Sequence, residues 1–252
     1  MTQPDAQPLA GQTVLITGGA RRLGAAMAQA LHAVGANVVI HHRKSAADAE
    51  TLLQTLNARR AGSATTVQAD LLDTAQLPEL VAAALRTFGR LDILVNNASS
   101  FYATPVGEIT AAKFDDLIGT NFRAPLFLAQ AAAPELRRRQ GLILNMVDIH
   151  GMRPLKQYPA YSAAKAALIM LTKSLARELA PQVRVNGIAP GPVMFPADLD
   201  VALQAEIIEK TLLKRSGNSQ DIAQAAVYFA TMAPFVTGQI LAVDGGRSQG
   251  AS

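Results

Sequence analysis

Tyr161 and Lys165 lie four residues apart in a segment of helical period, so their side chains share one face. A neighbouring ammonium favours the phenolate and lowers the pKa of a tyrosine toward the range that is useful for proton transfer. Asp148 follows an apolar run thirteen residues before Tyr161. An ionised aspartate only accepts hydrogen bonds, whereas a protonated one can pass a proton on. The spacing of Tyr161 and Lys165 therefore predicts a proton-delivering pair, and Asp148 could hold or pass a proton if it lies close to them.

A glycine-rich turn is the second chemical signal. Gly18, Gly19 and Gly24 follow the apolar run 13–16 and lead into an alanine-rich segment. Glycine lets the backbone approach a pyrophosphate, and the start of a helix offers free N–H groups and the positive end of a dipole. The turn therefore predicts a dinucleotide site.

The end of the second predicted strand indicates which dinucleotide is bound. NAD sites carry an acidic residue here that binds the ribose hydroxyls. In this chain the segment 41–45 holds no carboxylate, and Arg43, Lys44 and Ser45 suit a 2′-phosphate by charge and hydrogen bonding. The cofactor expected is NADP, as NADPH. The alternative is a solvated loop in which Ser45 caps the next helix.

These residues need a scaffold that alternates strand and helix. Continuous apolar strands with helical crossovers predict a single-domain α/β fold, a Rossmann-like doubly wound parallel sheet with helices on both faces. Ligands of such sheets bind at the carboxyl ends of the strands. We expect a flexible tail over 1–9 and one reductase domain over 10–252. The expected strands are 13–16, 38–40, 66–69, 91–95, 142–147, 184–188 and 239–243, and the expected helices are 25–34, 45–59, 74–88, 111–139, 158–179, 201–212 and 219–232.

Composition excludes several classes of function. The 252 residues contain no cysteine, and the four histidines lack the spacing of metal ligands, so we expect no metal site. No targeting segment and no run of 18 apolar residues is present, which predicts a cytoplasmic protein without a membrane span. The net charge of +4 comes from scattered basic residues, which disfavours nucleic acid and suits an anionic cofactor.

Together the motifs resemble the short-chain dehydrogenase/reductase family. They are the turn 17–24, Asn96-Asn97-Ala98, Asn121, Tyr161 with Lys165, and Pro190-Gly191. The resemblance implies that Tyr161 donates the proton, that Lys165 binds the ribose and lowers the tyrosine pKa, and that Asn121 holds a relay water. It also implies a homo-oligomer, often a tetramer. The implied cofactor site comprises Gly18, Arg21, Arg22, Leu23, Arg43, Lys44, Ser45, Asp70, Leu71, Asn97, Ala98, Ser99, Tyr161, Lys165, Pro190, Gly191 and Val193.

Departures from the common family pattern are similar to the pteridine reductase branch. Arg22 replaces the middle glycine, and Ser99 and Phe101 follow the asparagine pair. Asp148 stands at the family's third catalytic position, thirteen residues before the tyrosine, where serine is usual, so the resemblance places it in the proton-delivering site with Tyr161 and Lys165. This resemblance implies that Phe101 stacks on a pterin, that Arg22 bridges the cofactor phosphates and the pterin, and that Ser99 contacts both ligands. The alternatives are a core or lid aromatic for Phe101, a surface arginine for Arg22 and a solvated loop aspartate for Asp148.

The segment after Gly191 also departs from the wider family, because it lacks the usual threonine. Backbone groups near Val193 are then expected to hold the carboxamide, and the loop to Asp200 to shape or cover the pocket.

The main functional hypothesis is NADPH-dependent reduction of a C=N bond in a pterin or folate. An ionised Asp148 would repel a developing alkoxide, which makes ketone reduction the weaker alternative. In that alternative the substrate is an acyl-thioester or another carbonyl, and Asp148 only tunes Tyr161. A second alternative is a non-catalytic NADP-binding sensor, although the chain keeps Tyr161, Lys165 and Asn121.

Overall fold

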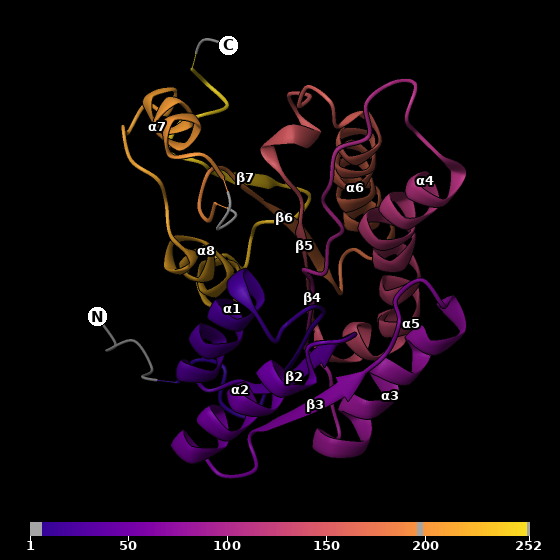
Figure 1. Ribbon diagram of the computed structural model, residues 1–252. Coiled ribbons are helices and arrows are strands. Elements are labelled where there is room, and N and C mark those ends of the chain that lie inside the picture. Colours follow the sequence, from indigo (N-terminus) through magenta and orange to yellow (C-terminus); the bar gives the residue numbers. More distant parts are fainter. Residues whose placement is uncertain (1–6, 196–198, 251–252) are drawn as a thin grey trace.

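A seven-stranded parallel sheet forms the centre of the computed structural model, which describes residues 7–195 and 199–250. The strand order is β3-β2-β1-β4-β5-β6-β7, so the chain winds outward in both directions from β1 (Figure 1). This confirms the predicted doubly wound α/β fold. The strands are β1 Thr13–Ile16, β2 Asn37–His42, β3 Ala64–Gln68, β4 Ile93–Asn96, β5 Leu142–Met146, β6 Arg184–Pro190 and β7 Ile240–Val243.

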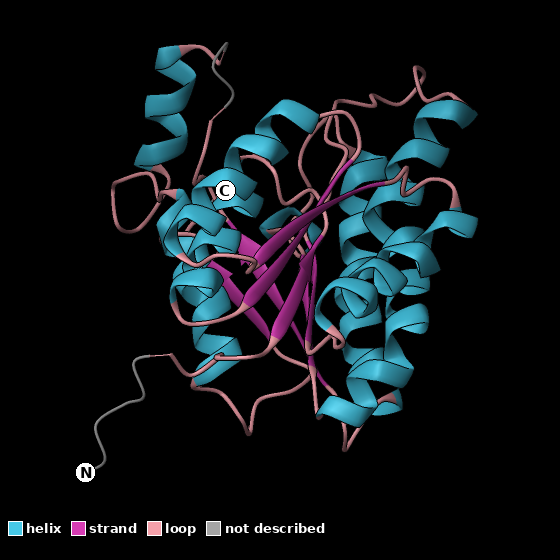
Figure 2. Cartoon of the chain, turned by 90° about the horizontal axis from the view of Figure 1, so that it is seen from below, coloured by secondary structure: helices cyan, strands magenta, loops and turns pink. Residues whose placement is uncertain are grey.

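Helices cover both faces of the sheet (Figure 2). Strand β1 shows why: Val14 and Ile16 pack into one core with α1 Arg22–Ala33, α2 Ala46–Arg59 and α8 Ser219–Thr231, whereas Leu15 packs into the other. The second core includes α3 Leu77–Phe88, α5 Ala124–Arg139 and α6 Pro159–Glu178. Burial on both faces explains the uninterrupted apolar strands. Two shorter helices are α4 Ala111–Ile118 and α7 Val201–Glu209.

The helical region predicted over 111–139 is helical along its whole length, but it is not one regular α-helix. Helix α4 ends at Ile118, and a π-helical turn, Gly119–Arg123, separates it from α5. In this turn the Ala124 N–H donates to the carbonyl of Gly119, five residues earlier. Such turns insert one residue without breaking the helix axis, so apolar periodicity does not reveal them. Within this π-helical turn Asn121 is buried, with 1% of its surface exposed.

The N-terminal part of the domain differs from the expected boundaries of the tail and of the first helix. Residues 1–6 lie outside the described residues, but Leu9 is 1% exposed and its N–H donates to the carbonyl of Val34 at 2.9 Å. The packed domain therefore includes Leu9. Helix α1 begins at Arg22 rather than at residue 25. Within the described part of the chain, no helix is both long and apolar enough to span a membrane.

Candidate active site

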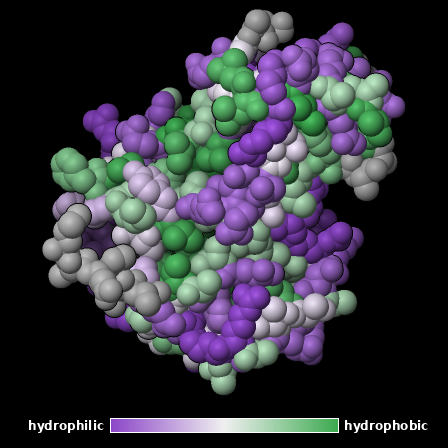
Figure 3. All heavy atoms as spheres, turned by 90° about the vertical axis from the view of Figure 1, so that its left-hand side faces the viewer, coloured by the Kyte–Doolittle hydropathy of each residue, from purple (hydrophilic) through white to green (hydrophobic). Residues whose placement is uncertain are grey.

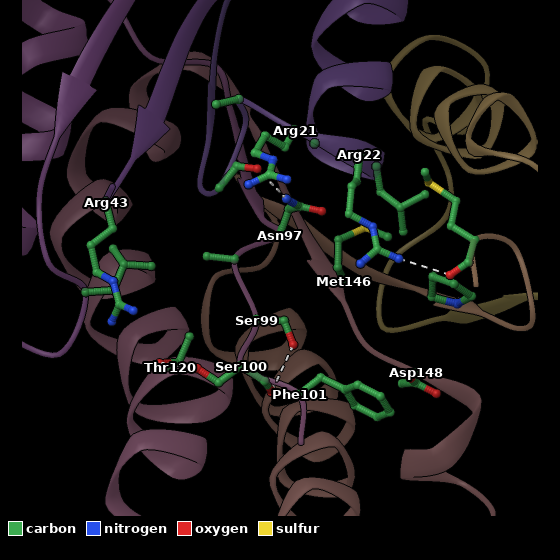
Figure 4. A pocket seen from close by; sticks show the side chains of 18 of the residues that line it. Arg21, Arg22, Arg43, Asn97, Ser99, Ser100, Phe101, Thr120, Met146 and Asp148 are labelled. Atoms are coloured by element: carbon green, nitrogen blue, oxygen red, sulfur yellow. Dashed lines mark hydrogen bonds between the residues drawn. The ribbon is translucent and has the colours of Figure 1, made fainter. Parts of the chain in front are cut away.

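One open cleft of about 660 Å³ lies at the carboxyl ends of the strands (Figure 4). Its walls come from the segments that follow β1, β2, β3, β4, β5 and β6. Every site residue named from the sequence lines this cleft except Asn121. The expected covering loop up to Asp200 includes residues 196–198, which lie outside the described residues.

The glycine turn is held by Asn97. The side-chain N–H groups of Asn97 donate to the carbonyls of Thr17 and Gly18 at 2.9 and 3.0 Å. Gly18 has a φ of +59°, which favours glycine. A Cβ on Gly24 would lie 2.2 Å from the Gly18 carbonyl oxygen and 2.7 Å from the Asn97 Nδ2. Glycine at position 24 therefore lets α1 start against the turn.

We expect Gly24→Ala to weaken dinucleotide binding at least roughly tenfold, the equivalent of one lost backbone hydrogen bond to a phosphate. The added methyl must displace the turn, because its nearest neighbours are backbone and the Asn97 amide. Fluorescence titration with NADPH measures the effect. Gln29→Ala, on the exposed face of the same helix, is the control and should keep the wild-type Kd. Equal affinity of the two variants would contradict the close-approach argument.

Arg22 spans the cleft. Its φ of +50° is a left-handed conformation that is costly for a residue with a side chain, and it explains why glycine suits this position. The guanidinium Nη2 donates to the carbonyl of Met194 at 3.0 Å, across from the segment after β6 (Figure 4). Arg22 therefore lies at the start of α1, and its side chain reaches across the cleft. This is the position at which the resemblance implies a residue between the cofactor phosphates and the substrate.

Cationic side chains gather at the end of β2. Arg43 and Lys44 line the cleft, and Arg43 Nη1 lies 3.9 Å from the Asp70 carboxylate in an exposed ion pair. Ser45 precedes α2 but makes no capping hydrogen bond through its side chain. The capping role considered for Ser45 is therefore not observed, and its hydroxyl can serve a ligand.

Two of the three predicted proton-handling residues, Asp148 and Tyr161, meet directly, and Lys165 lies next to them. The Tyr161 hydroxyl donates to Asp148 Oδ2 at 2.6 Å, and the other carboxylate oxygen accepts the His150 N–H at 2.8 Å. Lys165 Nζ donates to the carbonyl of Met146 at 2.9 Å. Tyr161 and Lys165 are buried, at 4% and 2% exposed. Asp148, just after β5, therefore forms one polar cluster with Tyr161 and Lys165 on α6.

The expected lowering of the tyrosine pKa is not observed. Burial raises the pKa of Tyr161, and the adjacent Asp148 carboxylate raises it further. Lys165 cannot reverse this, because its Nζ points to Met146 and lies 5.7 Å from the centre of the tyrosine ring. Burial also lowers the pKa of Lys165 to about 8, against an opposing effect of Asp148. Tyr161 therefore keeps its proton at neutral pH, and in this arrangement it is a weaker acid than a free tyrosine.

An aromatic wall flanks this cluster. The Phe101 ring is stacked on Tyr158, with centroids 4.8 Å apart and planes 14° apart, and it meets the Tyr161 ring edge-on at 4.8 Å. Phe101 is 50% exposed. Tyr158 was not among the predicted site residues, although it directly precedes α6 as its N-cap residue, three residues before Tyr161. Phe101 thus lines the cleft as part of an ordered aromatic group.

Asn121 reaches the cleft through Ser99. The Ser99 hydroxyl donates to Asn121 Oδ1 at 2.6 Å, and the Asn121 amide donates to the carbonyls of Ser100 and Leu117. Asn121 therefore fixes the loop after β4 through Ser99 and Ser100.

Comparisons with known proteins agree with this geometry. A family model described as enoyl-(acyl carrier protein) reductase matches residues 18–248. Pteridine reductase 1 of Leishmania tarentolae is 40% identical over an alignment of 292 residues, which covers 98% of this chain and 99% of that protein. The 3-oxoacyl-[acyl-carrier-protein] reductase FabG of Staphylococcus aureus is 34% identical, over 93% of this chain and 97% of that protein.

A solved structure is also similar. The blue fluorescent protein from a metagenomic library, in complex with NADPH, has a TM-score of 0.90 and 34% identity, and the match covers 96% of this chain and 99% of that one. Fold, motifs and relatives along nearly the whole length confirm the family resemblance. The chain belongs to the short-chain dehydrogenase/reductase family of oxidoreductases.

Proposed function

We propose that the chain reduces a C=N bond of a pterin or folate with NADPH. The observation that carries this proposal is the Asp148 carboxylate 2.6 Å from the Tyr161 hydroxyl. A carboxylate at this point repels a developing alkoxide but accepts hydrogen bonds from ring N–H groups. The 40% identity to pteridine reductase 1 supports the same substrate class.

NADP suits the residues of the cleft. The first N–H groups of α1 have no partners within the helix, which is the usual setting for a pyrophosphate. Arg43 and Lys44 offer two positive charges for a 2′-phosphate. The Ser45 hydroxyl makes no capping hydrogen bond to α2 and can donate to the same phosphate. A structural relative binds NADPH. When bound, this cofactor supplies the hydride.

Charge reversal tests the cofactor assignment. We expect Arg43→Glu with Lys44→Glu to raise the Kd for NADPH about 100-fold or more, because two charge-assisted contacts become repulsive, and to change the Kd for NADH less than about threefold. Fluorescence titrations with both nucleotides measure the split. The charge-matched control is Arg59→Glu with Lys173→Glu, both exposed and outside the cleft. An equal loss of affinity for NADPH and NADH would show that these residues do not bind the 2′-phosphate.

The proton is handled by Asp148 and Tyr161 as a pair. If Tyr161 alone gave up its proton, a phenolate would stand beside a carboxylate in a buried site, and two such charges repel strongly. Asp148, which is ionised in the resting site, avoids this repulsion by taking up a proton before the transfer. It then gives that proton to the tyrosine while the tyrosine protonates the ring nitrogen. The pair then ends as a carboxylate that accepts the tyrosine hydroxyl. The buried Lys165 ammonium stabilises that negative charge.

The aromatic wall favours a planar substrate. Tyr158 covers one face of Phe101, and half of the Phe101 surface stays exposed along the cleft. A flat heterocycle can stack on such a ring with a favourable free energy of about 1 kcal/mol beyond its buried area. An extended acyl chain gains no comparable stacking.

Ketone reduction is the rival within this family, supported by the similarity to FabG. An NADPH-oxidation screen decides between them, with dihydropterins, dihydrofolate, oxidised folate and an acetoacetyl thioester as substrates. Turnover of the pterins or folates supports the proposal. Turnover of the thioester alone would overturn it, and tight NADPH binding with no turnover of any substrate would favour the non-catalytic sensor.

A homo-oligomer, in particular a tetramer, belongs to the same proposal. Large apolar side chains are exposed in two regions: Phe114, Phe127 and Met170 on α4, α5 and α6, and Met232 and Phe235 after α8. Figure 3 shows the side that carries α7 and α8, where apolar side chains lie among polar ones. Two such regions on one chain suit two interfaces between copies. Sedimentation tests this, and a monomer at micromolar concentration would contradict it.

A further inference from the structure

His41, at the end of β2, holds the glycine turn through two consecutive amides. Its ring Nδ1 accepts the Gly18 N–H at 3.1 Å, and its backbone carbonyl accepts the Gly19 N–H at 2.9 Å. The ring Nε2 lies 3.1 Å from the carbonyl oxygen of Ala69, directly after β3. His41 is 1% exposed. One side chain therefore ties together three segments of the cleft.

The partners of the ring determine its state. A carbonyl oxygen only accepts, so Nε2 must carry the hydrogen that goes to Ala69, and Nδ1 must keep its lone pair for the Gly18 N–H. This is the neutral form of the imidazole. Burial lowers the pKa of His41 to about 4, with a further lowering by His42 and opposing effects of the Ala69 carbonyl and Asp70. The ring therefore adds no charge beside Arg43 and Lys44.

The Gly18 and Gly19 amides already donate to His41, so they are not free to bind a ligand. The donors left for a pyrophosphate are those of the first turn of α1, at Arg22 and Leu23. Ala69 in turn precedes Asp70, which lines the adenosine end of the cleft. The ring thus fixes how far the phosphate-binding turn stands from the loop after β3.

We propose that His41 is a positioning residue for the adenosine and pyrophosphate half of the dinucleotide. It sets the spacing of the two walls that this half must touch and contacts neither the substrate nor the reacting atoms. The inference rests on the NADP site of the proposed function and is independent of which substrate is reduced.

Two isosteric variants separate the two ring contacts. In His41→Asn the amide oxygen replaces Nδ1 and can still accept the Gly18 N–H, whereas in His41→Gln the amide nitrogen replaces Nε2 and can still donate to Ala69. Each variant loses one buried hydrogen bond, so we expect each to raise the Kd for NADPH and for 2′,5′-ADP roughly tenfold. His41→Leu, which loses both bonds, should bind more weakly than either. The kcat at saturating NADPH should stay within about twofold of wild type.

His32 provides the matched control. It is a second buried imidazole, 4% exposed, with Nε2 2.7 Å from the Ser63 hydroxyl and outside the cleft. His32→Asn should lower the thermal midpoint without changing the Kd for NADPH, as a merely structural histidine would. Thermal unfolding and fluorescence titration are measured on all variants.

Wild-type Kd values for NADPH in folded His41→Asn and His41→Gln would overturn the inference. So would an equal increase in His32→Asn. If His41→Leu does not fold, the Asn and Gln variants decide. A wild-type chain that does not bind NADPH refutes the proposed function as well, so the two failures are distinguishable.

Discussion

Replacement of Tyr161 by phenylalanine is expected to lower kcat for NADPH-dependent reduction about 1000-fold, within the range of a lost general acid. The hydroxyl that donates to Asp148 at 2.6 Å is the only group removed, and the aromatic contact with Phe101 stays. The Kd for NADPH should change less than about threefold, because the ring remains in place. Steady-state kinetics and fluorescence titration measure the two effects separately.

Tyr158→Phe is the control for this variant. It removes a hydroxyl from the neighbouring ring of the aromatic wall and leaves the stacking on Phe101 intact. We expect kcat within about threefold of wild type. If Tyr161→Phe and Tyr158→Phe had similar activities, the proton would have to come from another group.

The second large effect is expected at Asp148. Asp148→Ser should lower pterin or folate turnover about 100-fold or more, because the acceptor for ring N–H groups and the proton store are both lost. The same variant should reduce a carbonyl such as an acetoacetyl thioester better than wild type does, since a serine hydroxyl can donate to a developing alkoxide. Undiminished pterin turnover would contradict the role assigned to Asp148.

Asp148→Asn isolates the electrostatic part of this role. The asparagine oxygen can still accept the His150 N–H, so the local turn is retained. Because the Asp148 carboxylate raises the pKa of Tyr161, removal of its charge must lower that pKa. Tyrosinate absorbance should then appear at lower pH than in wild type in a spectrophotometric titration, with Asp148→Asn/Tyr161→Phe as the baseline. Coincident titration curves would show that the carboxylate does not act on Tyr161.

The fold could be predicted from the sequence because its signals are local. The runs at 14–16 and 142–144 are apolar throughout, which only strands buried on both faces require. The helices between them end at turn residues such as Gly89, whose φ of +69° closes α3. The rule that ligands bind at the carboxyl ends of parallel strands then located the cleft.

What sequence could not predict depends on packing between distant segments. The direction of the Tyr161 pKa shift follows from burial and from the distance to Asp148, neither of which the four-residue spacing from Lys165 encodes. The role of His41 depends on its register opposite Val67 on β3, which brings its ring next to Ala69. The π-helical turn at Asn121 shifts the helix by a single residue, which apolar periodicity tolerates.

The strand order has a consequence for how the chain is made. Strand β1 is synthesised first and ends in the middle of the sheet, paired with β2 on one side and β4 on the other. Its second neighbour, Ile93–Asn96, is synthesised about 75 residues after β1. Until then one edge of a largely apolar strand has no partner, which is the condition that invites intermolecular pairing. The nascent chain therefore has its greatest need of chaperones in the interval between the glycine turn and β4.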